Sequence, residues 1–106
     1  MPEDPTIQEL VRRLVSIYSP ERIYLFGSRA RGTSGPNSDY DLLLVVSDDS
    51  PKELLRSRLA YQSFWDLGVA SDVLIWKKKA FEDRRNLKAS LPGTVLREGR
   101  LIHGKE

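Results

Sequence analysis

Residues 27–46 read GSRARGTSGPNSDYDLLLVV, and they are the most informative part of the chain for its architecture. Its second half passes from two aspartates into a continuous apolar run, which is typical of a strand buried on both faces. Its first half is rich in Gly, Ser, Arg and Asn, which predicts a turn with room for one helical turn. A short β-rich run over residues 22–26 precedes it. The sequence therefore predicts two strands separated by a polar loop.

The rest of the chain alternates between helical and strand patterns. In chain order, it predicts a helix over 6–18, strands over 22–26 and 39–46, a helix over 51–66, a strand over 69–76, helices over 81–88 and 92–98, and an edge strand over 101–103. Trp65 and Trp76 are expected in the core or at an interface, and the tyrosines fit packing roles. This order predicts an α/β (α+β) fold in one domain, residues 1–106, with a small mixed sheet and helices packed on one face.

Composition narrows the classes of function. The chain has 106 residues, 40% of them hydrophobic and 30% charged, and no apolar run long enough to cross a bilayer. Its acidic N-terminus lacks the layout of a secretion signal, so we expect a cytoplasmic protein. Cysteine is absent and His103 is the only histidine, so any bound metal is expected to be a hard cation on carboxylates. A net charge of +2 without a basic stripe argues against a nucleic-acid-binding module.

Two aspartates at the head of a strand carry the clearest chemical signal. Asp39 and Asp41 point to the same side because side chains alternate along a strand, and Tyr40 points to the other. Neighbouring carboxylates repel each other, and divalent cations offset that repulsion. Asp72, near the beginning of another predicted strand, can add a third carboxylate. Three carboxylates suit two Mg²⁺ ions about 3.5–4 Å apart, which clamp the oxygens of an in-line phosphoryl displacement.

The loop before these aspartates suits the phosphates of a nucleotide. Gly27 directly follows a strand, so the backbone can approach a phosphate without a Cβ in the way. Ser28 offers a hydroxyl and a backbone N–H, and a helical turn beginning there favours an anion. Arg29 and Arg31 add positive charge, and Arg31 is the better placed of the two. These four residues are the predicted nucleotide-binding set.

GSRARG followed by SDYDL resembles the signature of the DNA polymerase β-like nucleotidyltransferase superfamily. Gly27-Ser28, a ten-residue spacer and Asp39-Tyr40-Asp41 are similar to the minimal nucleotidyltransferases, or MNT proteins, and the resemblance extends from the first helix to about Trp76. It implies that Ser28 contacts the triphosphate of ATP. It also implies that Asp39 and Asp41 hold two Mg²⁺ ions, with Asp72 as the third carboxylate.

The resemblance also implies a partner. MNT proteins commonly pair with a small helical HEPN toxin, and some neutralise it by transferring AMP from ATP to a tyrosine. Two alternatives remain open. One is a small-molecule acceptor such as an aminoglycoside, although no dedicated substrate domain is visible. The other is an antitoxin that acts by binding alone, although the complete set Asp39, Asp41 and Asp72 weighs against it.

Overall fold

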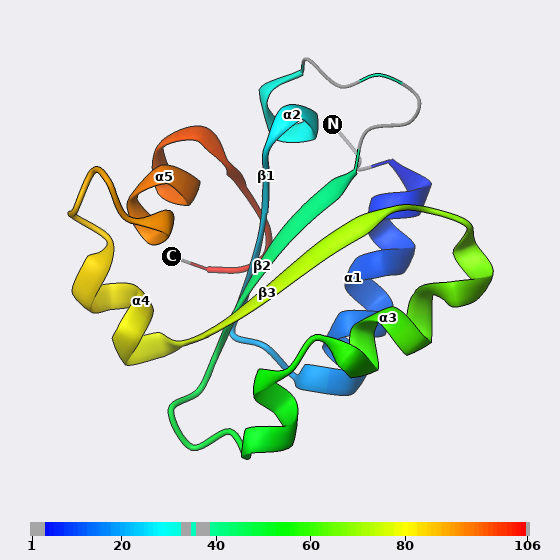
Figure 1. The fold of residues 1–106 in the computed structure, drawn as a ribbon, viewed down its shortest axis with the longest axis horizontal. Coiled ribbons are helices and arrows are strands. Elements are labelled where there is room, and N and C mark those ends of the chain that lie inside the picture. The colour runs from blue at the N-terminus through cyan, green and yellow to red at the C-terminus, as the bar shows by residue number, and fades with distance from the viewer. Residues whose placement is uncertain (1–3, 33–34, 36–38, 106) are drawn as a thin grey trace.

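A four-stranded mixed sheet forms the centre of the computed structural model, which describes residues 4–32, 35 and 39–105 (Figure 1). Its order is β3-β2-β1-β4. The strands are β1 (Arg22–Phe26), β2 (Tyr40–Val46), β3 (Ser71–Lys77) and β4 (Arg100–Gly104). β1 pairs antiparallel with β2 and with β4, whereas β2 and β3 are parallel. The predicted fold class, the mixed sheet and the edge strand near 101–103 are therefore confirmed.

Helices cover both faces of this sheet. They are α1 (Pro5–Tyr18), α2 (Ser28–Arg31), α3 (Arg58–Phe64), α4 (Lys78–Arg84) and α5 (Leu91–Glu98), with 3-10 turns η1 (Lys52–Leu55) and η2 (Trp65–Leu67). α1 and α3 lie on one side, and α4 and α5 on the other (Figure 1). The expectation of helices on a single face is therefore wrong.

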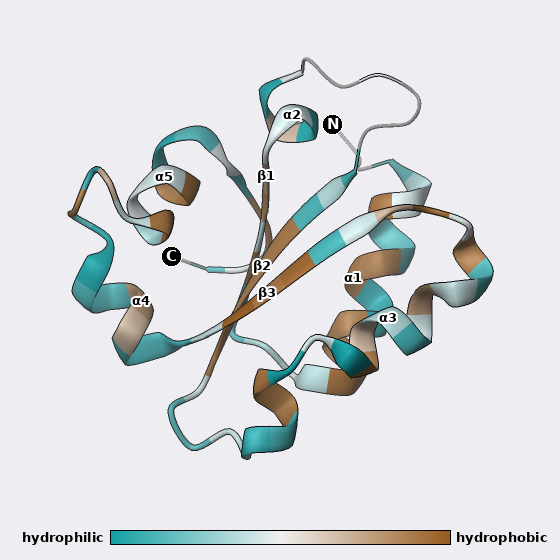
Figure 2. Ribbon diagram, viewed as in Figure 1, coloured by the Kyte–Doolittle hydropathy of each residue, from teal (hydrophilic) through white to brown (hydrophobic). Residues whose placement is uncertain are grey.

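The alternation of β2 explains the two-sided cover. Leu42 and Leu44 are buried in the cluster that holds α1 and α3, whereas Leu43 and Val45 are buried with Phe81 of α4 and the α5 residue Val95. Figure 2 shows β2 as a hydrophobic band at the centre of the molecule. A strand that is apolar on both faces needs a helical layer against each, because exposed apolar surface is costly in water.

The predicted helix over 51–66 is interrupted. η1 and α3 are separated at Arg56, whose backbone is extended at φ −110° and ψ 141°. The buried Tyr18 hydroxyl donates to the Arg56 carbonyl at 2.7 Å and accepts from the Ala60 N–H at 3.1 Å. A single side chain thus satisfies backbone groups that a continuous helix would have paired internally. After η2, Gly68 ends the segment at φ 64°.

The two tryptophans differ in their surroundings. Trp76 packs against the cluster on the α4 and α5 side. Trp65 is 82% exposed, so it is not a core residue, and its role at an interface stays a prediction. Within the described part of the chain, no helix has the length and apolar character needed to span a membrane.

Candidate active site

The three predicted carboxylates gather where β2 and β3 begin. Asp41 is the register partner of Asp72 in the parallel pair, and Asp39 directly precedes β2. Asp41 lies on the same face of β2 as Leu43, towards the α4 and α5 side, whereas Tyr40 packs into the α1 cluster. Parallel pairing therefore brings Asp72 to the Asp39–Asp41 pair from a distant part of the chain.

The pKa of Asp41 depends on the other two carboxylates. Partial burial raises the pKa of Asp41, and the negative charges of Asp72 and Asp39 raise it further. The positive charge of Arg31 acts in the opposite direction. A bound cation would lower the same pKa, because it replaces repulsion between the carboxylates with attraction to a shared ion.

The donor set fits magnesium. Its members offer only carboxylate oxygens, the ligands that hard cations prefer. Within the described residues, no three His, Cys, Asp or Glu side chains are already set around a single metal position. Mg²⁺ commonly takes one or two carboxylates and completes its shell with water and substrate phosphates. Neighbouring carboxylates that do not form a closed cage are compatible with that mode of binding.

Gly27 brings the loop backbone directly against Asp41. Its φ is +74°, and a Cβ at this position would lie 2.0 Å from Asp41 Oδ2. The helical turn α2 then runs over Ser28–Arg31 and is followed by Gly32, whose φ is +76°. The predicted helical turn is thus confirmed, and it starts beside the carboxylates. Residues 33, 34 and 36–38 of the predicted turn lie outside the described residues.

The two arginines of this loop have different neighbours. Arg31 acts electrostatically on Asp41, and its Nη1 lies 3.5 Å from Glu98 Oε1 of α5. The Arg29 guanidinium lies 3.8 Å from the centre of the Tyr40 ring, on the opposite face of β2 from Asp41. The structure therefore brings Arg31 to the carboxylate side of the sheet and places Arg29 against Tyr40. Nucleotide contacts by Ser28, Arg29 and Arg31 stay predictions.

Tyr61 is a site neighbour that sequence reasoning missed. It is 41% exposed, and its hydroxyl lies 3.4 Å from Asp72 Oδ1 while accepting the Val73 N–H at 3.1 Å. The sequence favoured a packing role for this tyrosine. No local pattern could have revealed the contact, because it depends on how α3 lies along β3. Glu98, 67 residues from Arg31 in the sequence, was missed for the same reason.

Known proteins resemble this chain in sequence and in fold. The family model for the nucleotidyltransferase domain matches residues 7–102. The candidate protein adenylyltransferase MJ0604 of Methanocaldococcus jannaschii is 31% identical over 105 residues, covering 97% of this chain and all of that protein.

Solved structures of toxin–antitoxin complexes are similar in fold. A toxin–antitoxin structure with AMP-PNP has a TM-score of 0.64 at 25% identity, covering 93% of this chain and 74% of that one. The complex of the tri-AMPylated Shewanella oneidensis HEPN toxin with its MNT antitoxin gives 0.54 at 22% identity, covering 94% and 68%. The predicted resemblance to MNT proteins is confirmed, and this chain belongs to the nucleotidyltransferase domain family.

Proposed function

We propose that this nucleotidyltransferase transfers AMP from ATP, with two Mg²⁺ ions, to a tyrosine hydroxyl of a HEPN toxin and thereby acts as its antitoxin. The observation that carries the proposal is the convergence of Asp39, Asp41 and Asp72 beside the Gly27 turn. The choice of a protein as the acceptor is supported by the adenylyltransferase relative and by the toxin–antitoxin structures of similar fold. Cytoplasmic localisation belongs to the same proposal.

The reaction is an in-line displacement at the α-phosphorus. The acceptor oxygen forms a bond to that phosphorus, the bond to the bridging oxygen of the leaving pyrophosphate breaks, and the acceptor gives up its proton. Two Mg²⁺ ions held by Asp39, Asp41 and Asp72 would polarise the acceptor oxygen and neutralise charge on the phosphates. The exposed Asp72 carboxylate can receive the released proton.

The remaining residues orient the nucleotide. Because Gly27 has no Cβ, the Asp41 carboxylate can lie directly against the backbone at the start of α2. Ser28 directs its backbone N–H and hydroxyl to the polyphosphate, and Arg31 adds positive charge on the same side. Catalysis then comes from positioning and electrostatic stabilisation, without a covalent enzyme intermediate.

The test uses ATP labelled in the α-phosphate. The protein, Mg²⁺ and a lysate of its own organism are incubated together, with the Asp41→Asn variant as the control. We expect a labelled protein band with the wild type alone, and mass spectrometry then identifies the acceptor protein and residue. Label on small molecules alone would contradict the protein acceptor.

A growth assay distinguishes this proposal from the alternative in which the protein neutralises the toxin by binding alone. Co-expression of the acceptor toxin with wild type should restore growth, and co-expression with Asp41→Asn should not. Equal rescue by the variant, at equal protein level, would show that binding alone neutralises the toxin.

A further inference from the structure

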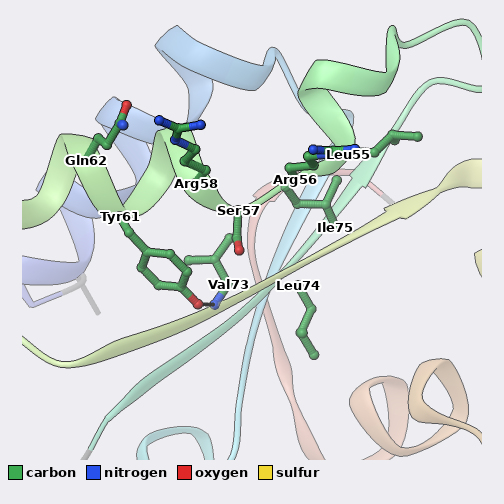
Figure 3. A pocket seen from close by; sticks show the side chains of 9 residues that line it. All are labelled: Leu55, Arg56, Ser57, Arg58, Tyr61, Gln62, Val73, Leu74 and Ile75. Carbon is green, nitrogen blue, oxygen red and sulfur yellow. Dashed lines mark hydrogen bonds between the residues drawn. The ribbon is translucent and has the colours of Figure 1, made fainter.

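An open groove runs along the outer edge of β3. It has a volume of about 790 Å³ and lies between β3 and the η1–α3 segment (Figure 3). Its lining comprises Leu55, Arg56, Ser57, Arg58, Tyr61, Gln62, Val73, Leu74 and Ile75. We call this feature the β3 groove. β3 is the end strand of the sheet, and among the described strands it pairs with β2 alone.

The backbone of β3 faces into the β3 groove. The Val73 N–H points away from β2, because it donates to the Tyr61 hydroxyl on α3 (Figure 3). Backbone direction repeats every two residues in a strand, so the N–H and carbonyl of Ile75 point to the same side. The groove therefore presents a strand edge of the kind that accepts an extended peptide as an additional strand.

Side chains give the β3 groove a defined chemical character. Arg56 and Arg58 line it, no acidic residue does, and neither arginine forms an ion pair with a described residue. The part-buried Leu55 and Ile75 supply apolar surface in the same groove. An adjoining hollow of about 450 Å³ shares both arginines and adds Lys52, with Glu53 as its single carboxylate. This combination complements an extended segment that carries acidic side chains.

The β3 groove leads to the candidate active site. Tyr61 lines its end nearest the start of β3, and the Tyr61 hydroxyl lies 3.4 Å from Asp72 Oδ1. A peptide that runs along the β3 edge would therefore bring one of its side chains to the third carboxylate of the site.

We propose that the β3 groove binds an acidic, extended segment of the protein acceptor as an added strand and presents an acceptor hydroxyl at Asp72. This inference rests on the proposed function for the identity of the reaction. A second copy of the chain is a poorer occupant, since two-fold pairing of β3 edges would bring Arg56 and Arg58 of both copies together.

The probe for the test is a fluorescent random copolymer of glutamate and tyrosine, and the control polymer contains lysine and tyrosine. Binding is measured by anisotropy without ATP, so that it is independent of catalysis. The test variant is Arg56→Glu/Arg58→Glu, and Lys88→Glu/Lys105→Glu provides the same change in net charge at exposed positions outside the groove. We expect the test variant to bind the acidic copolymer roughly tenfold or more weakly, and the control variant to resemble wild type.

Hydrogen exchange tests the added strand. The acidic copolymer should slow exchange of the Ile75 amide in the wild type and leave it unchanged in the test variant. Equal binding of both copolymers, equal loss in both variants, or an unprotected Ile75 would overturn the proposal. Binding with protection at Ile75, but without transfer of labelled AMP to the copolymer, would support the groove and count against the proposed reaction.

Discussion

Gly27 and Asp41 are packed so closely that residue 27 has no room for a side chain: a Cβ there would lie 2.0 Å from Asp41 Oδ2. The contact joins the turn after β1 to a carboxylate of β2. The geometry of the candidate active site therefore depends on a glycine that has no functional group of its own.

Gly27→Ala is expected to displace Asp41 and to reduce nucleotidyl transfer by about 100-fold or more, because misplacing a reacting group by an ångström is costly. The free energy of unfolding should fall by about 1–3 kcal/mol through clash and positive φ. Gly32→Ala is the matched control: its φ is +76°, but nothing lies within 4 Å of its Cβ position. If Gly32→Ala lost as much activity, backbone strain and not the contact with Asp41 would be responsible.

Asp41→Asn should abolish transfer while leaving the fold intact, and at neutral pH it should stabilise the protein by up to about 1 kcal/mol. The reason is that burial raises the pKa of Asp41 above 3.8, and repulsion from Asp72 and Asp39 raises it further. The folded protein thus holds this proton more tightly than the unfolded chain, and stability contributed by the group increases as pH falls through its folded pKa.

Chemical denaturation at several pH values checks the direction of this pH dependence of stability. Wild type should approach the stability of the asparagine variant on acidification, and added Mg²⁺ should stabilise wild type more than the variant. A variant that is less stable than wild type at neutral pH would show that Asp41 makes a structural contribution larger than its repulsion.

Glu82→Gln should destabilise the protein by about 1–3 kcal/mol at neutral pH, because it weakens the partner of a buried cation. Arg22 is 5% exposed, and its Nη2 lies 2.6 Å from Glu82 Oε1. Hydrogen bonds from Arg85 and then Arg22 lower the pKa of Glu82. The stabilising contribution of Glu82 is therefore fully present above pH 4.5, the ordinary pKa of a glutamate. It is lost as the pH falls through the lower pKa of the folded state.

Thermal unfolding across the acidic range tests this assignment. The difference between wild type and Glu82→Gln should shrink as the pH falls. Asp83→Asn is the control on the same helix, because Asp83 pairs only with the exposed Lys79 among the described residues. A pH-independent difference between wild type and Glu82→Gln would rule out the loss of a charged pair.

Tyr61→Phe removes the hydroxyl that contacts Asp72 and the Val73 N–H. We expect kcat to fall about three- to tenfold through loss of orientation at Asp72, with stability changed by less than about 1 kcal/mol because Tyr61 is part-exposed. Tyr18→Phe offers the contrast: its hydroxyl is bound to Arg56 and Ala60 in the interior, so about 1–3 kcal/mol of stability should be lost. Similar kinetics for Tyr61→Phe and wild type would remove Tyr61 from the site.

The strand pattern and the loop composition were sufficient to predict part of the geometry of the candidate site. Alternation along a strand fixes Asp39 and Asp41 on one face, because the period of two is a property of the local backbone. Gly27 at a strand end predicts a close approach of the backbone to a phosphate, and this stays a prediction. What the structure shows at Gly27 is a close approach to Asp41. The apolar run that follows also required cover on both faces, although the sequence order suggested helices on only one.

Contacts between segments that are distant in the sequence could be identified only from the tertiary structure. The pairing of Asp41 with Asp72 depends on β3 returning parallel to β2, and the contact of Tyr61 with Asp72 depends on α3 lying along β3. The break at Arg56 is likewise set by the Tyr18 hydroxyl, which belongs to another helix. Local sequence patterns predicted which residues are candidates for the chemistry and on which face of their own strand they lie. Packing alone decided which of them meet, because no local periodicity encodes the neighbour that another strand or helix will supply.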